Sequence, residues 1–129
     1  MPVKFGTVEF YEAMADMLNN DAQWADVGKK LSYSMVYVFG APLEKEFYVV
    51  FDKGRVTEVR EAGDGDAERS DFVVSGAPDA WRGVFEKKIN PTAALTTGKL
   101  KVKGKMTTLL KNISAFSYVV DSMTKVEFE

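Results

Sequence analysis

The chain has 129 residues, of which 46% are hydrophobic and 28% are charged, and its formal net charge is −2. This size and composition are typical of a globular protein, so we expect one domain over residues 1–129. The sequence contains neither cysteine nor histidine. This excludes disulfides, thiolate nucleophiles, cysteine-ligated metal sites and histidine general bases.

The ends of the chain give no targeting signal. No cleavable-signal layout is found in the N-terminal sequence MPVKFGTVEFYEAM, and no apolar run is long enough to span a membrane. The C-terminal VEFE is neither a peroxisomal nor a retention signal. We therefore expect a cytoplasmic protein.

The first half of the chain predicts two helices and then three strands. Residues 7–18 repeat apolar side chains at helical spacing, and residues 21–28 predict a second, shorter helix. Residues 31–39 alternate with a period of two, and the runs 45–51 and 55–61 follow across short turns, the second of which is Asp52-Lys53-Gly54. Short connections between successive strands predict an antiparallel meander.

A polar stretch, residues 62–70, separates this meander from the second half. Asp64, Asp66 and Glu68 occupy alternate positions, but the spacing lacks the glycine and distal glutamate of an EF-hand loop. We interpret the stretch as a solvated loop and expect no metal site.

The second half predicts a strand over residues 71–76, helices over 78–89 and 91–97, a strand over 99–104 and a helix over 106–123. The last helix would be about 27 Å long at ~1.5 Å per residue. Together the elements predict an α+β fold, in which helices pack on one face of a five-stranded, mostly antiparallel sheet.

The segment SDFVVSGAPDAWRGVFEKKINPTAALTTGKLKVKGKM, residues 70–106, resembles the core of the sterol carrier protein-2 (SCP-2) sterol-transfer family. The resemblance rests on a strand leading into a tryptophan-containing helix, on Asn-Pro-Thr-Ala-Ala, and on Gly-Lys-Leu-Lys-Val-Lys-Gly before the C-terminal helix. This chain departs from the family at Lys105, where Asn or Asp is common, and in the length of its last helix.

The resemblance implies that the sheet and helices enclose an apolar tunnel that binds a fatty acid, a fatty acyl-CoA, a sterol or a phospholipid, without catalysis and without a cofactor. The six methionines and nine phenylalanines of the chain would suit an adaptable wall. The predicted wall residues are Met35, Phe39, Val49, Trp81, Phe85, Leu95, Met106, Leu110, Ile113 and Phe116.

Positive charge is concentrated in residues 87–120, which contain seven lysines and no acidic residue, so this segment carries +7 and the remainder −9. Lysines protect an edge strand from aggregation, but a cluster also attracts anions. We expect Lys99, Lys101, Lys103 and Lys105 to contact the phosphates of coenzyme A or of an anionic membrane. Nucleic acid is not expected, because the segment lacks arginine and its aromatic residues lie outside the lysine strand.

Two other functions are compatible with the residues. A small isomerase or cyclase could use a buried carboxyl group, with Asp71 or Asp121 beside Tyr33 or Tyr37, and such a group would have a raised pKa. An interaction module would instead present an open apolar groove to a partner helix. We expect a monomer or a weak dimer.

Overall fold

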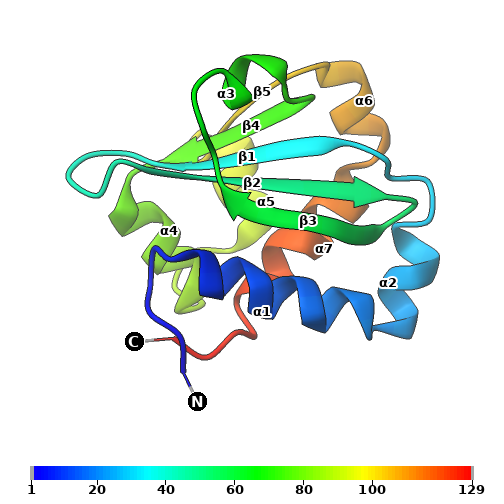
Figure 1. Cartoon of the computed structure of the whole chain (residues 1–129), viewed down its shortest axis with the longest axis horizontal. Helices are drawn as coiled ribbons and strands as arrows, with labels where there is room; N and C mark the ends of the chain where they lie inside the picture. The colour runs from blue at the N-terminus through cyan, green and yellow to red at the C-terminus, as the bar shows by residue number, and fades with distance from the viewer. Residues whose placement is uncertain (1, 129) are drawn as a thin grey trace.

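The computed structural model describes residues 2–128, except for the side chains of residues 91 and 92. It has the predicted α+β class, with a five-stranded sheet in the order β3-β2-β1-β4-β5 (Figure 1). The strands are β1 (Ser34–Phe39), β2 (Lys45–Asp52), β3 (Arg55–Glu61), β4 (Phe72–Gly76) and β5 (Lys101–Lys103).

The meander of β1, β2 and β3 is antiparallel, as predicted. The chain then crosses to the other side of β1, where β4 pairs in parallel with β1 and β5 pairs antiparallel with β4. In this register Tyr37 of β1 lies opposite Phe47 of β2 and Val74 of β4. All three side chains are buried, so the centre of the sheet supplies an apolar face.

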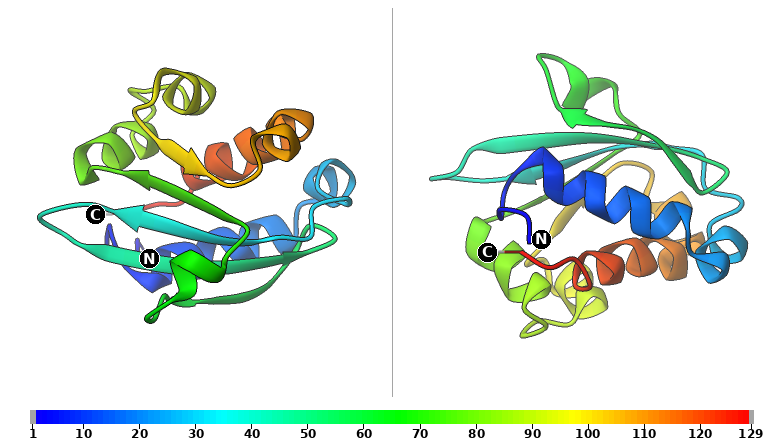
Figure 2. Two further views of the ribbon diagram at one scale, coloured as in Figure 1. Left: turned by 90° about the horizontal axis from the view of Figure 1, so that it is seen from above. Right: turned by 60° about the horizontal axis from the view of Figure 1, so that its bottom comes forward.

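Helices cover that face, which we call the inner face. They are α1 (Val8–Asn19), α2 (Ala22–Val27), α4 (Pro78–Phe85), α5 (Pro91–Thr97), α6 (Met106–Lys111) and α7 (Ile113–Met123). Figure 2 shows α1 and α7 beside each other beneath the sheet, whereas the single turn α3 (Asp66–Arg69) lies on the opposite, outer face.

Local signals explain several helix ends. The Asp21 carboxylate accepts hydrogen bonds from the backbone N–H groups of Gln23 and Trp24, and the Asn90 side chain caps α5 through Ala93 N–H. Gly98 ends α5 with a φ of +83°, a conformation that favours glycine. The Thr7 hydroxyl donates to the Lys4 carbonyl instead of capping α1.

The long final helix predicted over residues 106–123 is wrong as a single element. Asn112 has φ −121° and ψ 23°, outside the helical region, and its side chain donates to the Thr108 carbonyl at 2.9 Å. Asparagine side chains compete with helical backbone bonds in this way. The helix is therefore divided into α6 and α7, and α6 is free to adopt its own orientation.

Three other predicted elements are shorter than expected. The strand predicted over residues 31–39 is regular only over Ser34–Phe39. The helix predicted over residues 78–89 ends at Phe85, and Lys87 has a left-handed φ of +65°. The strand predicted over residues 99–104 is regular only over Lys101–Lys103.

The stretch 62–70 is not simply a solvated loop. The Asp66 carboxylate accepts hydrogen bonds from Arg60 Nη1 at 2.7 Å, from the Gly63 N–H at 2.6 Å and from Arg69 Nη2 at 3.1 Å. The bond from Arg60, and then that from Gly63, lowers the pKa of Asp66 well below its ordinary value. Asp66 is buried, so this network holds α3 against the outer face.

Candidate functional site

A continuous layer of aromatic and aliphatic side chains separates the inner face of the sheet from the helices. Phe39 of β1 stacks on Trp81 of α4 with ring centroids 5.1 Å apart, and Phe10 of α1 stacks on Phe85 of α4 at 4.4 Å. The Trp81 indole N–H donates to the Val38 carbonyl at 2.9 Å. The layer therefore has fixed ring contacts at the end of the sheet that α4 covers.

At the other end of the layer, three rings lie near α6. Phe72 contacts Phe116 at 5.0 Å and Tyr33 at 5.4 Å, both edge to face. Gly104, just before α6, has a φ of +141°, and its backbone is so close to Phe72 that a Cβ could not be accommodated. Gly104 thus brings the chain closely over this aromatic group as it enters α6.

Two tyrosines occupy the middle of the layer. Tyr11 of α1 stacks on Tyr37 of β1 with ring centroids 5.1 Å apart and also contacts Phe47 at 5.0 Å. Burial raises the pKa of both phenols above the ordinary value, and the neighbouring Tyr37 adds to the shift of Tyr11. Both groups are therefore neutral at physiological pH.

The structure divides the ten predicted wall residues into two sets. Six of them are buried in the layer: Met35, Phe39, Val49, Trp81, Phe85 and Phe116. Leu95 and Ile113 are half-buried and pack against its border. Met106 and Leu110, both on α6, are 51% and 67% exposed. Whether any of the ten contacts a ligand stays a prediction.

Helix α6 differs from the other covering helices in the apolar side chains that it leaves exposed, since two of the three exposed large hydrophobic residues of the described chain, Met106 and Leu110, lie on it. Leu109 is its one buried residue, and the helix packs mainly on α7. Helix α7, in contrast, is attached at several points: the Tyr118 hydroxyl donates to the Asp21 carboxylate, and the Tyr118 ring stacks on Trp24 at 5.4 Å. The Asp21 bond raises the pKa of Tyr118 to about 12.

The four lysines named from the sequence are all exposed and lie along the edge of the sheet formed by β5 and at the start of α6. Of the seven lysines in residues 87–120, Lys88 pairs with Glu86 at 3.3 Å, and the other six have no ion pair with any described residue. The edge position fits protection against aggregation. The unneutralised charge also fits attraction to an anionic surface.

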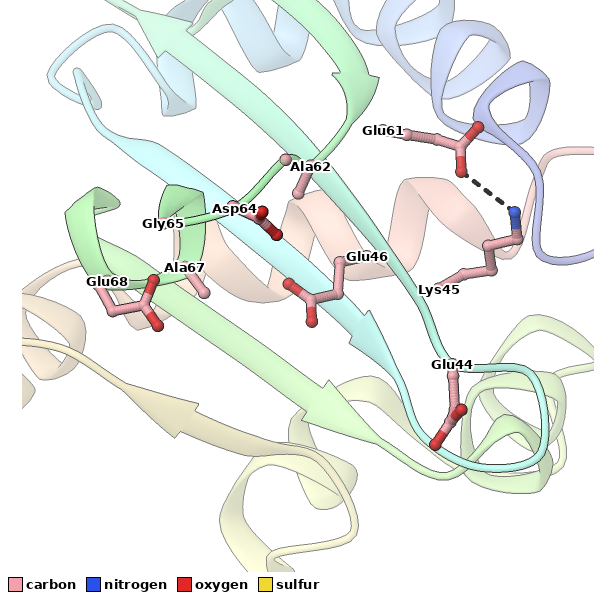
Figure 3. A pocket seen from close by; sticks show the side chains of 10 residues that line it. Glu44, Lys45, Glu46, Glu61, Ala62, Asp64, Gly65, Ala67 and Glu68 are labelled. Carbon is pink, nitrogen blue, oxygen red and sulfur yellow. Dashed lines mark hydrogen bonds and ion pairs between the residues drawn. The ribbon is translucent and has the colours of Figure 1, made fainter.

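Four depressions on the described part of the surface do not coincide with the predicted wall. Figure 3 shows a depression of about 410 Å³ on the outer face, where Glu46, Asp64 and Glu68 surround the opening and Lys45 pairs with Glu61. Three further depressions are also open to solvent, and none of the four is lined by a predicted wall residue. Packed aromatic rings fill the layer between the sheet and the helices. The apolar tunnel therefore stays a prediction.

Comparison with known proteins identifies the family. The profile of the SCP-2 sterol transfer family matches residues 18–117. The chain belongs to this family. The match includes the strand, the tryptophan helix and the lysine-rich segment on which the sequence resemblance rests. A search of curated protein sequences finds no match.

Solved structures have the same fold. A crystal structure of sterol carrier protein 2 matches with a TM-score of 0.83 and 20% identity, covering 95% of this chain and 99% of that one. A protein from Thermus thermophilus, named a conserved hypothetical protein, matches with a TM-score of 0.80 and 18% identity over 98% and 92% of the two chains. A UbiJ-SCP2 ubiquinone synthesis protein matches at 0.62 and 15%, over 91% and 89%.

Membrane and metal features were also searched. Within residues 2–128, none of the helices combines the length and apolar character that a membrane span requires. The described residues also contain no group of three or more acidic side chains arranged to hold a metal ion.

Sequence reasoning did not single out Tyr11. Its position on the apolar stripe of the first helix indicates a buried ring, but nothing in the pattern shows whether the hydroxyl finds a partner. That information depends on which groups of β1 and β2 face it in the folded chain.

Proposed function

We propose that this protein is a non-catalytic lipid carrier, which takes a fatty acid, a fatty acyl-CoA, a sterol or a phospholipid into the layer between the inner face and the helices. Membership of the SCP-2 sterol transfer family supports this function. The observation that carries it is the exposure of two apolar side chains of α6, Met106 and Leu110, beside an aromatic interior.

A ligand needs an entrance, and α6 is the element best suited to provide it. It is short, it buries one residue, and it joins α7 through the non-helical Asn112. Elements with few buried contacts open at low free-energy cost. Gly104, which leads into α6, lies against Phe72, so outward movement of α6 would open this end of the layer without breaking strand pairs of the sheet.

We propose further that loading takes place at an anionic membrane. The exposed apolar side chains of α6 lie beside Lys105 and Lys111, and β5 adds further lysines along the same edge. Apolar side chains next to lysines are typical of segments that bind at the membrane interface. The same charge would attract the phosphates of an acyl-CoA.

The isomerase hypothesis receives no comparable support. It requires a carboxyl group with a raised pKa on the inner face, but Asp71 and Asp121 are exposed. Asp71 accepts a hydrogen bond from the Ser34 N–H at 2.9 Å, which serves to join two segments of the sheet. The buried Asp66 lies on the outer face, and its pKa is lowered.

The function can be tested with a fluorescent fatty-acyl probe. We expect the wild-type protein to bind the probe, and we expect Leu110→Glu and Ile113→Glu to weaken binding, because a charge beside an apolar ligand is costly to desolvate. Glu46→Gln, on the outer face, is the control and should leave binding unchanged. Failure of the wild-type protein to bind would contradict the carrier function and favour an interaction module.

A further inference from the structure

One buried polar atom in the described part of the chain lacks a hydrogen-bond partner, and it is the Tyr11 hydroxyl oxygen. Other buried polar side-chain groups of the interior are partnered. Trp24 Nε1 donates to Gly54 O at 2.6 Å, Trp81 Nε1 to Val38 O at 2.9 Å, Ser122 Oγ to Val119 O at 2.5 Å and Tyr37 Oη to Met35 Sδ at 3.6 Å.

An unpartnered buried hydroxyl is unfavourable, because it gives up its bonds to water and receives none from the protein. Phenylalanine at position 11 would keep the ring contacts with Tyr37 and Phe47 and would avoid this cost. The hydroxyl therefore needs an explanation that lies outside the ligand-free fold.

The surroundings of Tyr11 determine which chemical group could be its partner. The residue lies on the buried face of α1, and its neighbours are the rings of Phe10, Tyr37, Phe39 and Phe47. No lysine or arginine is buried anywhere in the described residues. A carboxylate or phosphate brought to this position would have no cation to neutralise it, and its desolvation would be costly.

A neutral oxygen meets no such obstacle. A protonated phenol can donate to a carbonyl oxygen, and it can both donate to and accept from a hydroxyl. Burial, followed by the nearby Tyr37, raises the pKa of Tyr11, so its proton is retained. The buried methionines Met14 and Met35 belong to the same layer, and their flexible side chains can rearrange to make room for an alkyl group.

We propose that the Tyr11 hydroxyl anchors the polar group of the carried lipid, and that this group is a single neutral hydroxyl or carbonyl. This inference rests on the proposed carrier function and specifies its ligand. The ligand class is a neutral lipid with one buried oxygen, such as a sterol or a long-chain alcohol or ketone. The lysine-rich edge then contacts the membrane from which the lipid is taken and does not bind the lipid's polar group.

The test compares Tyr11→Phe with Tyr118→Phe, since each variant removes one phenolic oxygen. The Tyr118 hydroxyl has a partner, Asp21, and Tyr118 is not one of the predicted wall residues. Binding of hexadecanol, hexadecane and palmitate at pH 7 is followed by tryptophan emission, and the Tm of each ligand-free protein is measured.

We expect the wild-type protein to bind hexadecanol more tightly than palmitate. Tyr11→Phe should weaken hexadecanol binding by about tenfold, because the ligand's oxygen is left unpaired, and should not affect hexadecane binding. The same variant should raise the Tm of the ligand-free protein. Tyr118→Phe should do the opposite, lowering the Tm and leaving hexadecanol binding unchanged.

The outcomes separate this inference from the proposed function. If the wild-type protein binds these lipids but Tyr11→Phe binds hexadecanol equally well, or if palmitate binds more tightly, the anchor is overturned and the carrier function stands. A lower Tm for Tyr11→Phe would also overturn it, because the hydroxyl would then have a structural partner such as buried water. If the wild-type protein binds none of the three, the carrier function and the anchor both fail.

Discussion

Helices α1 and α6 both have an apolar stripe in the sequence, but the stripe of α1 is buried in the fold and that of α6 is largely exposed. Helix α1 buries Phe10, Tyr11, Met14, Ala15 and Leu18 against the sheet and α7. Helix α6 buries Leu109, while Met106 and Leu110 remain exposed. An apolar stripe therefore predicts a buried face only where other elements are positioned to cover it.

The difference follows from position in the sheet. Helix α1 packs on β2 and β3, so its apolar side chains are covered by the sheet. Helix α6 follows β5, the three-residue edge strand, and extends beyond the paired region before Asn112 turns the chain into α7. We infer that α1 stabilises the fold and that α6 is left available for the exchange of a ligand.

The largest effect is expected from truncating the stripe of α1. Phe10→Ala removes a fully buried ring that stacks on Phe85, and it should lower the free energy of unfolding by about 3–5 kcal/mol. Leu110→Ala, the matched truncation on α6, should change it by less than about 0.5 kcal/mol. Urea denaturation measures both. Equal losses would mean that α6 is covered in solution as well as α1 is.

A somewhat smaller effect is expected at the lysine edge beside α6. Each lysine near an anionic bilayer contributes about 1 kcal/mol, so Lys99→Gln, Lys101→Gln and Lys103→Gln together should weaken binding to anionic vesicles by roughly two orders of magnitude. Co-sedimentation at low and high salt measures this, since exposed charges are screened by salt.

The charge-matched control is the triple variant Lys29→Gln, Lys30→Gln and Lys53→Gln, whose lysines are exposed near α2. It should bind anionic vesicles nearly as well as the wild-type protein. If both triple variants lose the same affinity, the attraction depends on net charge alone. If the wild-type protein ignores anionic vesicles at low salt, the lysines serve only to protect the edge strand.

The smallest expected effect is on the pH dependence of stability. It tests whether α7 is held firmly against its neighbours, as α1 is, or weakly, as α6 is. The Tyr118 hydroxyl, and then the Trp24 N–H, lowers the pKa of Asp21, whereas the Asp21 bond raises that of Tyr118. The stability from Asp21 is therefore present above the unfolded pKa of about 4 and lost as the pH falls through the lower folded value. That from Tyr118 is lost as the pH rises from about 10 through about 12.

Asp21→Asn keeps the helix cap but removes the charge. We expect a modest loss of stability at pH 7 that shrinks as the pH falls from about 4 through the lower folded pKa of Asp21, where the carboxylate of the folded wild-type protein becomes protonated. Urea titrations at several pH values measure it. A difference that stays constant down to low pH would show that the ion does not hold α7, and α7 would then resemble α6.

Much of this fold could be predicted from local sequence patterns. Alternation defined the strands of the meander, and Asp21, Asn90 and Gly98 marked helix ends because their preferences act over a few residues. The division at Asn112 was missed, since the apolar stripe continues through that position and outweighs the weaker signal of one asparagine. The structure of residues 62–70 was missed because the hydrogen bond that holds the Asp66 carboxylate comes from Arg60, which belongs to another element, β3.

The candidate site was only partly accessible from the sequence. By itself the sequence determined that β1 and β2 present an apolar face, that residues 70–106 resemble the SCP-2 family, and that charge gathers in residues 87–120, because these are properties of composition and spacing. Only the tertiary structure decided that Met106 and Leu110 are exposed and that Tyr11 has no hydrogen-bond partner. Exposure and hydrogen-bond pairing depend on which distant segments approach a side chain, and no local pattern contains that information.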